Sequence, residues 1–334
     1  MLKRLCLTAL LASLTYPSMS WANDSTASLA TGGLVLLRNQ DVSMQQEDLF
    51  ISEKQVRVDY VFSNSAREDV ESVVAFPMPD MRLDTQSMVS IPDPQSDNFF
   101  DFTVTADGQP IKPQLQQRAV AGGLDVTDIL TGKGIAVSPF DSKVIAAINA
   151  LDDSTKNEWM SRGLLVDSGE LVDGKLSYAP AWILKATFWW SMKFPAGKEI
   201  RVSHRYTPSV GGFVAIRFDP LAKTPSAEDA AHARKYCRDR DFDQTVAKVL
   251  QKEAPNSYPF RESWISYVLT TAANWAGPIQ KFKLTVDKGD PDDLISFCGT
   301  GVKKTGPTTF EMTATDFWPT EDLNILLLKR NKAP

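Results

Sequence analysis

Apolar and polar residues alternate with a period of two along several short stretches of this chain. One such stretch, residues 55–62, has apolar side chains at Val56, Val58, Tyr60 and Phe62. Period two with β-branched and aromatic residues on one face predicts a half-buried strand. Strands are also expected at 70–76 and 100–105, and the second leads into an Asp107-Gly108 hairpin turn. Residues 28–118 therefore predict a small antiparallel β-sandwich.

Strand patterns return in the last part of the chain. They are expected at 186–194, 199–206, 264–271, 281–286, 294–298, 309–313 and 324–328. In the first two, the even-numbered positions are apolar, which predicts a hairpin with its loop centred on Gly197. This register would place Trp190 opposite His204 and Trp189 opposite Arg205.

Helix signals interrupt these strands. Asp141-Ser142 can cap a helix that is apolar on one face, and a second short helix fits 154–162, ended by Gly163. Ser226 and Asp229 fit the start of a helix over 227–236, followed by another at 242–253. The predicted fold class is mainly β, with two immunoglobulin-like antiparallel β-sandwich regions and short helical insertions.

The N-terminus has the pattern of a secretory signal peptide. Lys3 and Arg4 precede an apolar run of roughly a dozen residues, which is too short to span a bilayer. Ser20-Trp21-Ala22 offers small residues at the two positions that a signal peptidase reads, so the mature chain should begin at Asn23 and be periplasmic. An uncleaved membrane anchor is the alternative. The expected units are a signal peptide at 1–22, a β-sandwich domain at 23–118, a linker or helical-hairpin insertion at 119–180, and a β domain at 181–334 with a helical patch at 226–253.

Two cysteines remain after removal of Cys6 with the leader. An even pair in an oxidising compartment predicts a disulfide between Cys237 and Cys298, although two buried free thiols would also fit. Neither cysteine lies in a CxxC motif, which argues against a thioredoxin-like role.

Charge narrows the range of partners. The formal net charge is −5, and removal of Lys3 and Arg4 takes it to −7. No block of Lys and Arg is present, so nucleic-acid binding is not expected, and no later segment is apolar enough to span a membrane.

Common catalytic and metal-binding motifs are absent from the sequence. It contains no GxSxG or HExxH motif, and its 2 histidines, His204 and His232, lack the spacing of metal ligands. The segment Asp239–Asp243 begins like a calcium loop, but Gln244 and Leu250 stand where that loop needs Gly and Glu. Neither a metal, a cofactor nor a catalytic residue is therefore predicted.

Trp189 is a large aromatic residue on the polar face of its predicted strand. With Arg201 and Arg205, it forms a candidate binding surface for a sugar, a peptide or a partner protein. Alternatively, another element covers Trp189. His204, on the apolar face, is expected to be a core histidine.

Six segments resemble a bacterial family known as domain of unknown function 4424. They are Leu29–Leu34, Glu47–Ser52, Ala75–Pro79, Tyr206–Gly212, Asn274–Ile279 and Ser296–Gly299. The resemblance spans nearly the whole mature chain and is weakest at 119–180. It implies an exported protein with immunoglobulin-like β structure, but no activity, cofactor or catalytic residue.

Together these features favour a non-enzymatic exported binding or interaction protein, with an unknown envelope protein or glycan as its partner. The first alternative is a hydrolase acting on cell-envelope material through carboxylates such as Asp48 or Asp219, which would need two carboxylates about 5–9 Å apart in a cleft. The second is an assembly module that pairs a strand with a partner.

Overall fold

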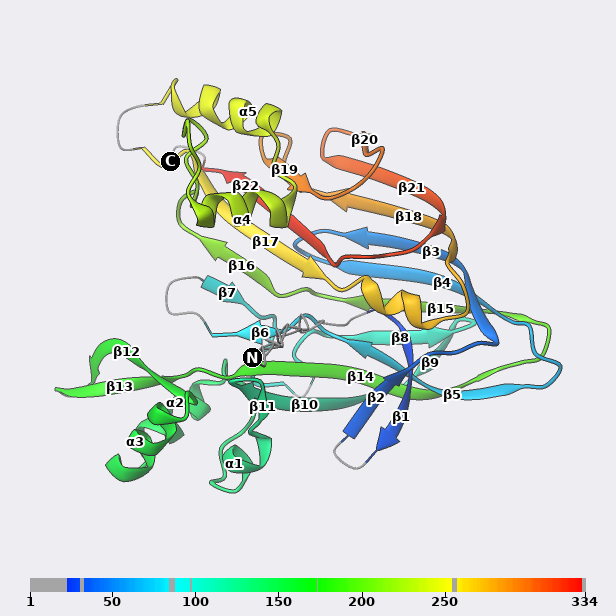
Figure 1. The fold of residues 1–334 in the computed structure, drawn as a ribbon, viewed down its shortest axis with the longest axis horizontal. Helices are drawn as coiled ribbons and strands as arrows, with labels where there is room; N and C mark the ends of the chain where they lie inside the picture. The colour runs from blue at the N-terminus through cyan, green and yellow to red at the C-terminus, as the bar shows by residue number, and fades with distance from the viewer. Residues whose placement is uncertain are drawn as a thin grey trace, which may run out of the picture.

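The computed structural model describes residues 23–30, 33–83, 88–96, 98–172, 174–253 and 257–331. The expected signal peptide therefore lies outside the described residues. The fold is mainly β, and the strands form three large sheets and a two-stranded ribbon (Figure 1).

The largest sheet, called the central sheet, runs through the middle of the molecule (Figure 1). Its strands, in spatial order, are β20 (Lys303–Lys304), β21 (Thr309–Phe317), β18 (Ile279–Asp287), β3 (Val42–Ile51), β4 (Val56–Asn64), β15 (Glu199–Tyr206), β8 (Thr103–Ala106) and β9 (Gln109–Ile111). All neighbours are antiparallel except β3 and β18, which are parallel. This one pair departs from the predicted antiparallel pattern.

A second sheet, called the lower sheet, packs against the central sheet (Figure 1). It contains β11 (Leu124–Asp125), β10 (Gln114–Ala121), β14 (Ile183–Phe194), β5 (Val70–Pro77), β1 (Ser25–Ala30) and β2 (Gly33–Leu37), with β6 (Met81–Arg82) paired to β14.

The upper sheet contains β19 (Leu294–Phe297), β22 (Leu323–Arg330), β17 (Phe260–Tyr267), β16 (Val210–Phe213) and β7 (Met88–Ser90). One face joins the main core through residues such as Ile265 and Ile325, and the other face packs against helices. The ribbon of β12 (Leu165–Val172) and β13 (Lys175–Pro180) stands apart at the lower left of Figure 1.

Helices occur in two groups (Figure 1). One group contains α2 (Ser142–Asn149) and α3 (Asp153–Ser161), which contact the ribbon, and α1 (Thr127–Thr131), which contacts β10; the other contains α4 (Ala227–Tyr236) and α5 (Arg240–Leu250) on the upper sheet. The short 3-10 helix η1 (Thr270–Asn274) contacts β1 and is outside both groups. The predicted caps are confirmed, since Asp141 accepts a bond from the backbone nitrogen of Lys143, and Ser226 from that of Asp229. The linker or helical hairpin predicted for 119–180 also contains the β12–β13 ribbon, which the sequence pattern did not predict.

The hairpin predicted for residues 186–206 is wrong, although the assignment of faces is correct. Even-numbered residues of β14 and β15 are buried, as the alternation predicts. The two strands do not pair, because β14 bonds to β5 and β10 whereas β15 bonds to β4 and β8. Trp190 and His204 instead meet across the sandwich, with ring centroids 5.2 Å apart.

Two of the connections between the lower sheet and the central sheet meet at one corner. The loop between β14 and β15 is fixed to Asn64, whose carbonyl oxygen accepts a bond from the backbone nitrogen of Gly197 at 3.0 Å. The side chain of Asn64 donates to the carbonyl oxygen of Phe194 at 2.9 Å. The connection from β4 to β5 crosses between the same two sheets. Alternation identifies the buried face of a strand, but it cannot distinguish a hairpin from such a crossing.

Candidate functional site

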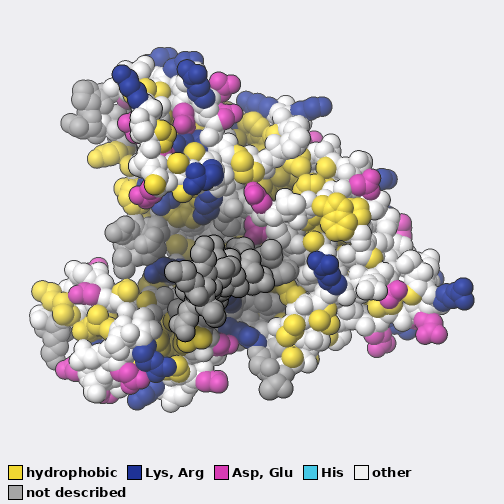
Figure 2. All heavy atoms as spheres, viewed as in Figure 1, with side chains coloured by type: hydrophobic (Ala, Val, Ile, Leu, Met, Phe, Trp, Pro, Cys, Tyr) yellow, Lys and Arg dark blue, Asp and Glu magenta, His cyan; other side chains and the backbone are white. Residues whose placement is uncertain are grey.

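A groove opens between the upper sheet, the ribbon and the segment after β5. Its volume is about 510 Å³, within the range typical of small-ligand sites. It is lined by Pro79, Asp80, Met81, Arg82, Leu83, Val89, Val166, Asp167, Ser209, Gly211, Trp264 and Ser266. Figure 2 shows the molecule indented on its left side, between the lobe of α4 and α5 and the lobe of the ribbon.

Trp264 forms the aromatic part of the groove. It lies on β17 directly opposite Gly211 of β16, and a Cβ atom at Gly211 would lie 2.1 Å from the indole ring. Only glycine therefore lets the indole lie against this strand. The guanidinium of Arg217 lies 4.6 Å from the centre of the ring and is bonded to Glu262 at 2.9 Å. These contacts fix the indole before any ligand arrives.

Charged and hydroxyl groups surround the indole. Asp80 receives two bonds from Lys185, at 2.7 and 2.9 Å, whereas Arg82 is exposed and forms no ion pair with a described residue. Asp167 and Ser209 lie on other walls of the groove. The groove thus offers side chains of positive and negative charge, and hydroxyl groups, beside one aromatic ring.

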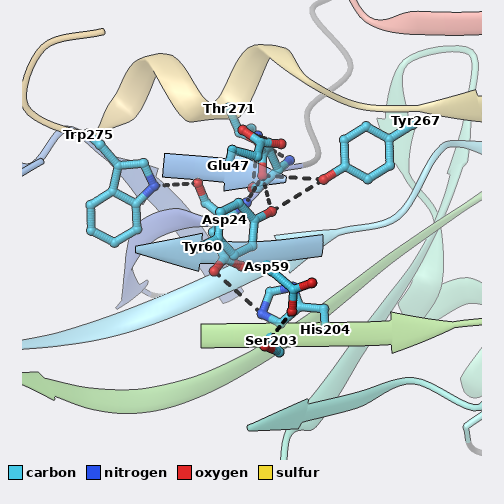
Figure 3. A network of polar contacts seen from close by, with 10 residues as sticks. Asp24, Glu47, Asp59, Tyr60, Ser203, His204, Tyr267, Thr271 and Trp275 are labelled. Atoms are coloured by element: carbon cyan, nitrogen blue, oxygen red, sulfur yellow. Dashed lines mark hydrogen bonds and ion pairs between the residues drawn. The ribbon is translucent and has the colours of Figure 1, made fainter. Parts of the chain in front are cut away.

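A separate polar cluster is buried where the described chain begins (Figure 3). Asn23, Asp24 and Glu47 are each 0% exposed. The side-chain nitrogen of Asn23 donates to both carboxylate oxygens of Glu47 at 3.1 Å. The side-chain oxygen of Asn23 accepts bonds from the hydroxyls of Tyr60 and Tyr267. This arrangement satisfies Asn23, but no Lys or Arg among the described residues forms an ion pair with Glu47.

The same cluster contains two polar groups without hydrogen bonds. Neither carboxylate oxygen of Asp24 and neither ring nitrogen of His204 has a partner among the described residues. Asp24 Oδ2 and His204 Nε2 lie 3.5 Å apart. Burial lowers the pKa of His204 to about 3, so its ring is neutral at pH 7. Burial raises the pKa of Glu47 to about 8, and burial together with the nearby Glu47 raises the pKa of Asp24.

A third cluster lies under α4 and α5, and its acidic side chains are bonded to arginine side chains. Arg238 bonds to Asp229 and to Asp243, the latter at 2.6 Å, and its guanidinium lies 3.7 Å from the ring centre of Phe218. Beside it, Glu262 is 0% exposed. Burial acts to raise the pKa of Glu262, but contacts with His232 and Arg217 outweigh burial and leave the pKa below its ordinary value.

The predicted disulfide is confirmed next to this cluster. Cys237 ends α4 in the left-handed conformation, with φ 48°, and is bonded to Cys298 after β19. The two Cα atoms are 4.9 Å apart. The bond joins the helical patch to the upper sheet.

The structure does not bring Trp189, Arg201 and Arg205 together on one surface. Trp189 is half-buried on the outer face of the lower sheet, between Ala75 and Gln114 of its neighbouring strands. Arg201 and Arg205 lie on the outer face of the central sheet. Because the two sheets face each other, the predicted contact between Trp189 and Arg205 is wrong. Separate binding roles for these residues stay predictions.

The carboxylates proposed for a hydrolase are also not brought into the groove. Asp48 lies on β3 opposite Asp59, and Asp219 caps a turn by accepting a bond from the backbone nitrogen of Leu221. Neither residue lines the groove.

Within the described ranges, no group of three His, Cys, Asp or Glu residues is placed to hold a metal ion. Among the helices described, none is long and apolar enough to cross a membrane.

Sequence reasoning missed both the groove and the buried cluster. Their residues come from distant segments, such as Asp24, Glu47 and Thr271, which no local spacing connects. The family resemblance offered a signal, because its segments contain Glu47, Asn274 and Trp275 of the cluster and Pro79, Ser209 and Gly211 of the groove.

The fold and these sites define a mainly β protein of several sheets with a polar groove at its side. The chain matches the family model for a domain of unknown function (DUF4424) over residues 22–326, and it belongs to that family. No curated protein matches its sequence. Among solved structures, it is similar to a protein described as a "putative nutrient binding protein" from Legionella pneumophila subsp. pneumophila str. Philadelphia 1. The identity is 14%, the match covers 92% of this chain and 70% of that chain, and the TM-score is 0.42. A likeness of this degree carries no argument about function.

Proposed function

We propose that this protein is an exported, non-enzymatic binding protein that takes a saccharide of the cell envelope in the groove beside Trp264. The observation that carries the proposal is the combination of an immobilised indole with carboxylates, hydroxyls and Arg82, which forms no ion pair with a described residue, in about 510 Å³. Sugars present an apolar ring face and a rim of hydroxyls, which suits one aromatic ring among polar groups.

Export is supported by the leader pattern at 1–22 and by the disulfide, which persists in oxidising compartments. A periplasmic location follows from the same two features. We also propose that the central and lower sheets, which face each other, have immunoglobulin-like topology.

Binding is tested by calorimetry of the processed protein against mono- and disaccharides of the cell envelope, with short peptides as a second ligand class. We expect a saccharide to bind and Trp264→Ala to weaken binding by about tenfold or more, by analogy with nucleic-acid bases, whose stacking on one aromatic side chain is worth about 1–3 kcal/mol. Gly211→Ala should also weaken binding, because its Cβ would displace the indole.

Trp189→Ala is the matched control, since it removes a half-buried tryptophan from a different sheet. Binding should be unchanged in this variant. If the peptides bind but no saccharide does, the ligand class is wrong. If Trp264→Ala and Trp189→Ala bind a saccharide equally well, the groove is not the site.

A further inference from the structure

The residues that would begin the mature chain after cleavage at Ala22 are buried, although the termini of folded proteins are usually exposed. Asn23, Asp24 and Ser25 are each 0% exposed. The hydroxyl of Thr271 contacts both the backbone nitrogen and the carbonyl oxygen of Asn23. The indole nitrogen of Trp275 donates to the carbonyl oxygen of Asp24 at 2.6 Å. The segment that begins at Asn23 is therefore held as part of the core (Figure 3).

The acids beside this segment lack a positive partner. Among the described residues, no Lys or Arg forms an ion pair with Asp24 or Glu47. A buried carboxylate without a cation is strongly unfavourable, and such a group either stays protonated or requires a counter-charge. His204 lies beside Asp24, and neither of its ring nitrogens has a hydrogen-bond partner among the described residues.

We infer that the α-ammonium group of Asn23, formed when the leader is removed after Ala22, is the counter-ion of Glu47 and Asp24 in the mature protein. The inference rests on the export proposed above. It makes the junction between residues 22 and 23 a processing site whose product completes the core.

The chemistry is a peptide hydrolysis by a signal peptidase. The bond between the carbonyl carbon of Ala22 and the nitrogen of Asn23 breaks, the hydroxyl of water goes to that carbon, and its proton goes to the nitrogen. The new amine, with an ordinary pKa of about 7.7–8.0, takes a further proton from solvent at neutral pH. One neutral N–H donor becomes a cation with three donors at the same buried position, beside Thr271 and on the residue whose own side-chain amide donates to both oxygens of Glu47.

The other titratable groups of the cluster cannot replace this charge. Burial holds the pKa of His204 at about 3, so it is neutral at pH 7. Burial also raises the pKa values of Tyr60, Tyr206 and Tyr267, so their hydroxyls remain protonated. The ammonium group of Asn23 is thus the cation that the surroundings of Glu47 and Asp24 call for.

The test uses precursors exported and processed in the same host. One is unchanged, and the other has a single Gly inserted between Ala22 and Asn23, which moves the ammonium group by one residue. Each is also made with Glu47→Gln, giving a double-mutant cycle on unfolding by urea at pH 7. We expect the insertion to lower the folding equilibrium constant by about tenfold or more, and Glu47→Gln to remove most of that loss.

Access to the amine gives a second measurement that does not depend on stability. In the folded proteins, an acylating reagent should modify the α-amine of Asn23 at least about tenfold more slowly than the α-amine of the inserted Gly, because closed structure protects buried groups. Mass spectrometry of the N-terminal peptide follows the reaction.

Three results would overturn the inference. One is an insertion whose cost is the same with Glu47 and with Gln at position 47, which would indicate steric disruption alone. Another is equal acylation of the two amines. The third is a mature N-terminus at a residue other than Asn23, found by N-terminal sequencing. That result would also refute the predicted cleavage site. The first two results would leave the proposals of export and saccharide binding untouched.

Discussion

The cluster under α4 and α5 and the cluster around Asn23 both bury acidic side chains, but only the first surrounds them with cations. Arg238 joins Asp229 to Asp243, and Arg217 bonds to Glu262. Glu47, by contrast, is hydrogen-bonded to the side-chain amide of Asn23 and forms no ion pair with a described Lys or Arg, and burial raises its pKa to about 8. Glu262 and Glu47 are both 0% exposed, and the pKa of Glu262 is below its ordinary value because His232 and Arg217 contact it, whereas burial raises the pKa of Glu47. Among the described residues, Glu47 and Asp24 are thus the buried acids of these two clusters that lack an ion pair with Lys or Arg.

The largest effect is expected for Arg238→Met, which keeps much of the side chain's volume and removes its charge. It leaves the buried Asp229 and the partly exposed Asp243 without their cation, so the free energy of unfolding should fall by about 3–5 kcal/mol. Urea denaturation measures the loss. The double variant Arg238→Met, Asp229→Asn should recover part of it, and no recovery would mean that packing on Phe218, rather than charge, makes the contribution of Arg238.

The disulfide next to Arg238 should contribute a similar amount. A bond that closes a loop with a sequence separation of 61 stabilises by about 4 kcal/mol in the chain-entropy model. Cys237→Ser and Cys298→Ser should each lower stability to a similar extent, and the double variant should cost little more than either. Additive losses would contradict a single shared bond, and two alkylated cysteines in protein purified without reductant would show that none forms.

His204 should produce a smaller effect that depends on pH. Its folded-state pKa of about 3 is below the ordinary value of 6.5, so its contribution to stability is present above about pH 6.5 and is lost as the pH falls toward 3. In the steepest part of this window, stability should fall by about 1.4 kcal/mol per pH unit. His204→Phe removes the titrating group, so the difference in unfolding free energy between the variant and the unchanged protein should have this slope between pH 6 and 4. The same slope in both proteins would mean that His204 is already protonated in the fold.

The smallest effect is expected at the exposed pair of Lys185 and Asp80. The side chains are 42% and 33% exposed, and ion pairs at the surface contribute about 0–1 kcal/mol. Lys185→Ala should therefore change the unfolding free energy by less than about 1 kcal/mol, and added salt should reduce the difference further. A loss as large as that of Arg238→Met would contradict the role assigned to burial in this comparison.

Local patterns predicted much of the secondary structure. Alternation identified β4, β5 and the buried faces of β14 and β15, and capping residues marked the start of α2 and α4. Strand pairing was predicted less well, because β3 bonds to β18 across more than 200 residues and no local signal specifies such a partner. The division of the chain at residues 118 and 181 stays a prediction, and strands from both sides of it share the central sheet.

The functional residues were harder to predict for the same physical reason. Trp189 is a large aromatic residue on the polar face of an alternating strand, so its local sequence pattern marks it. Trp264 does not depart from the pattern of its strand, and its position depends on Gly211 of another strand. The carboxylate of Glu47 stands in an alternating segment like any surface acid, and its burial appears only when β3 and the start of the chain come together. Sites assembled from distant segments leave little trace in spacing.

The parallel pair of β3 and β18 has a consequence for the timing of folding. The central sheet needs residues 42–51 and 279–287 at once, so it cannot be completed while the C-terminal part of the chain is still inside a translocation channel. Proteins dominated by such distant contacts fold slowly, typically in milliseconds to seconds. An N-terminus-first passage through a membrane would therefore carry this chain across in an unfolded form, and the sheet would close only after strand β18 had emerged.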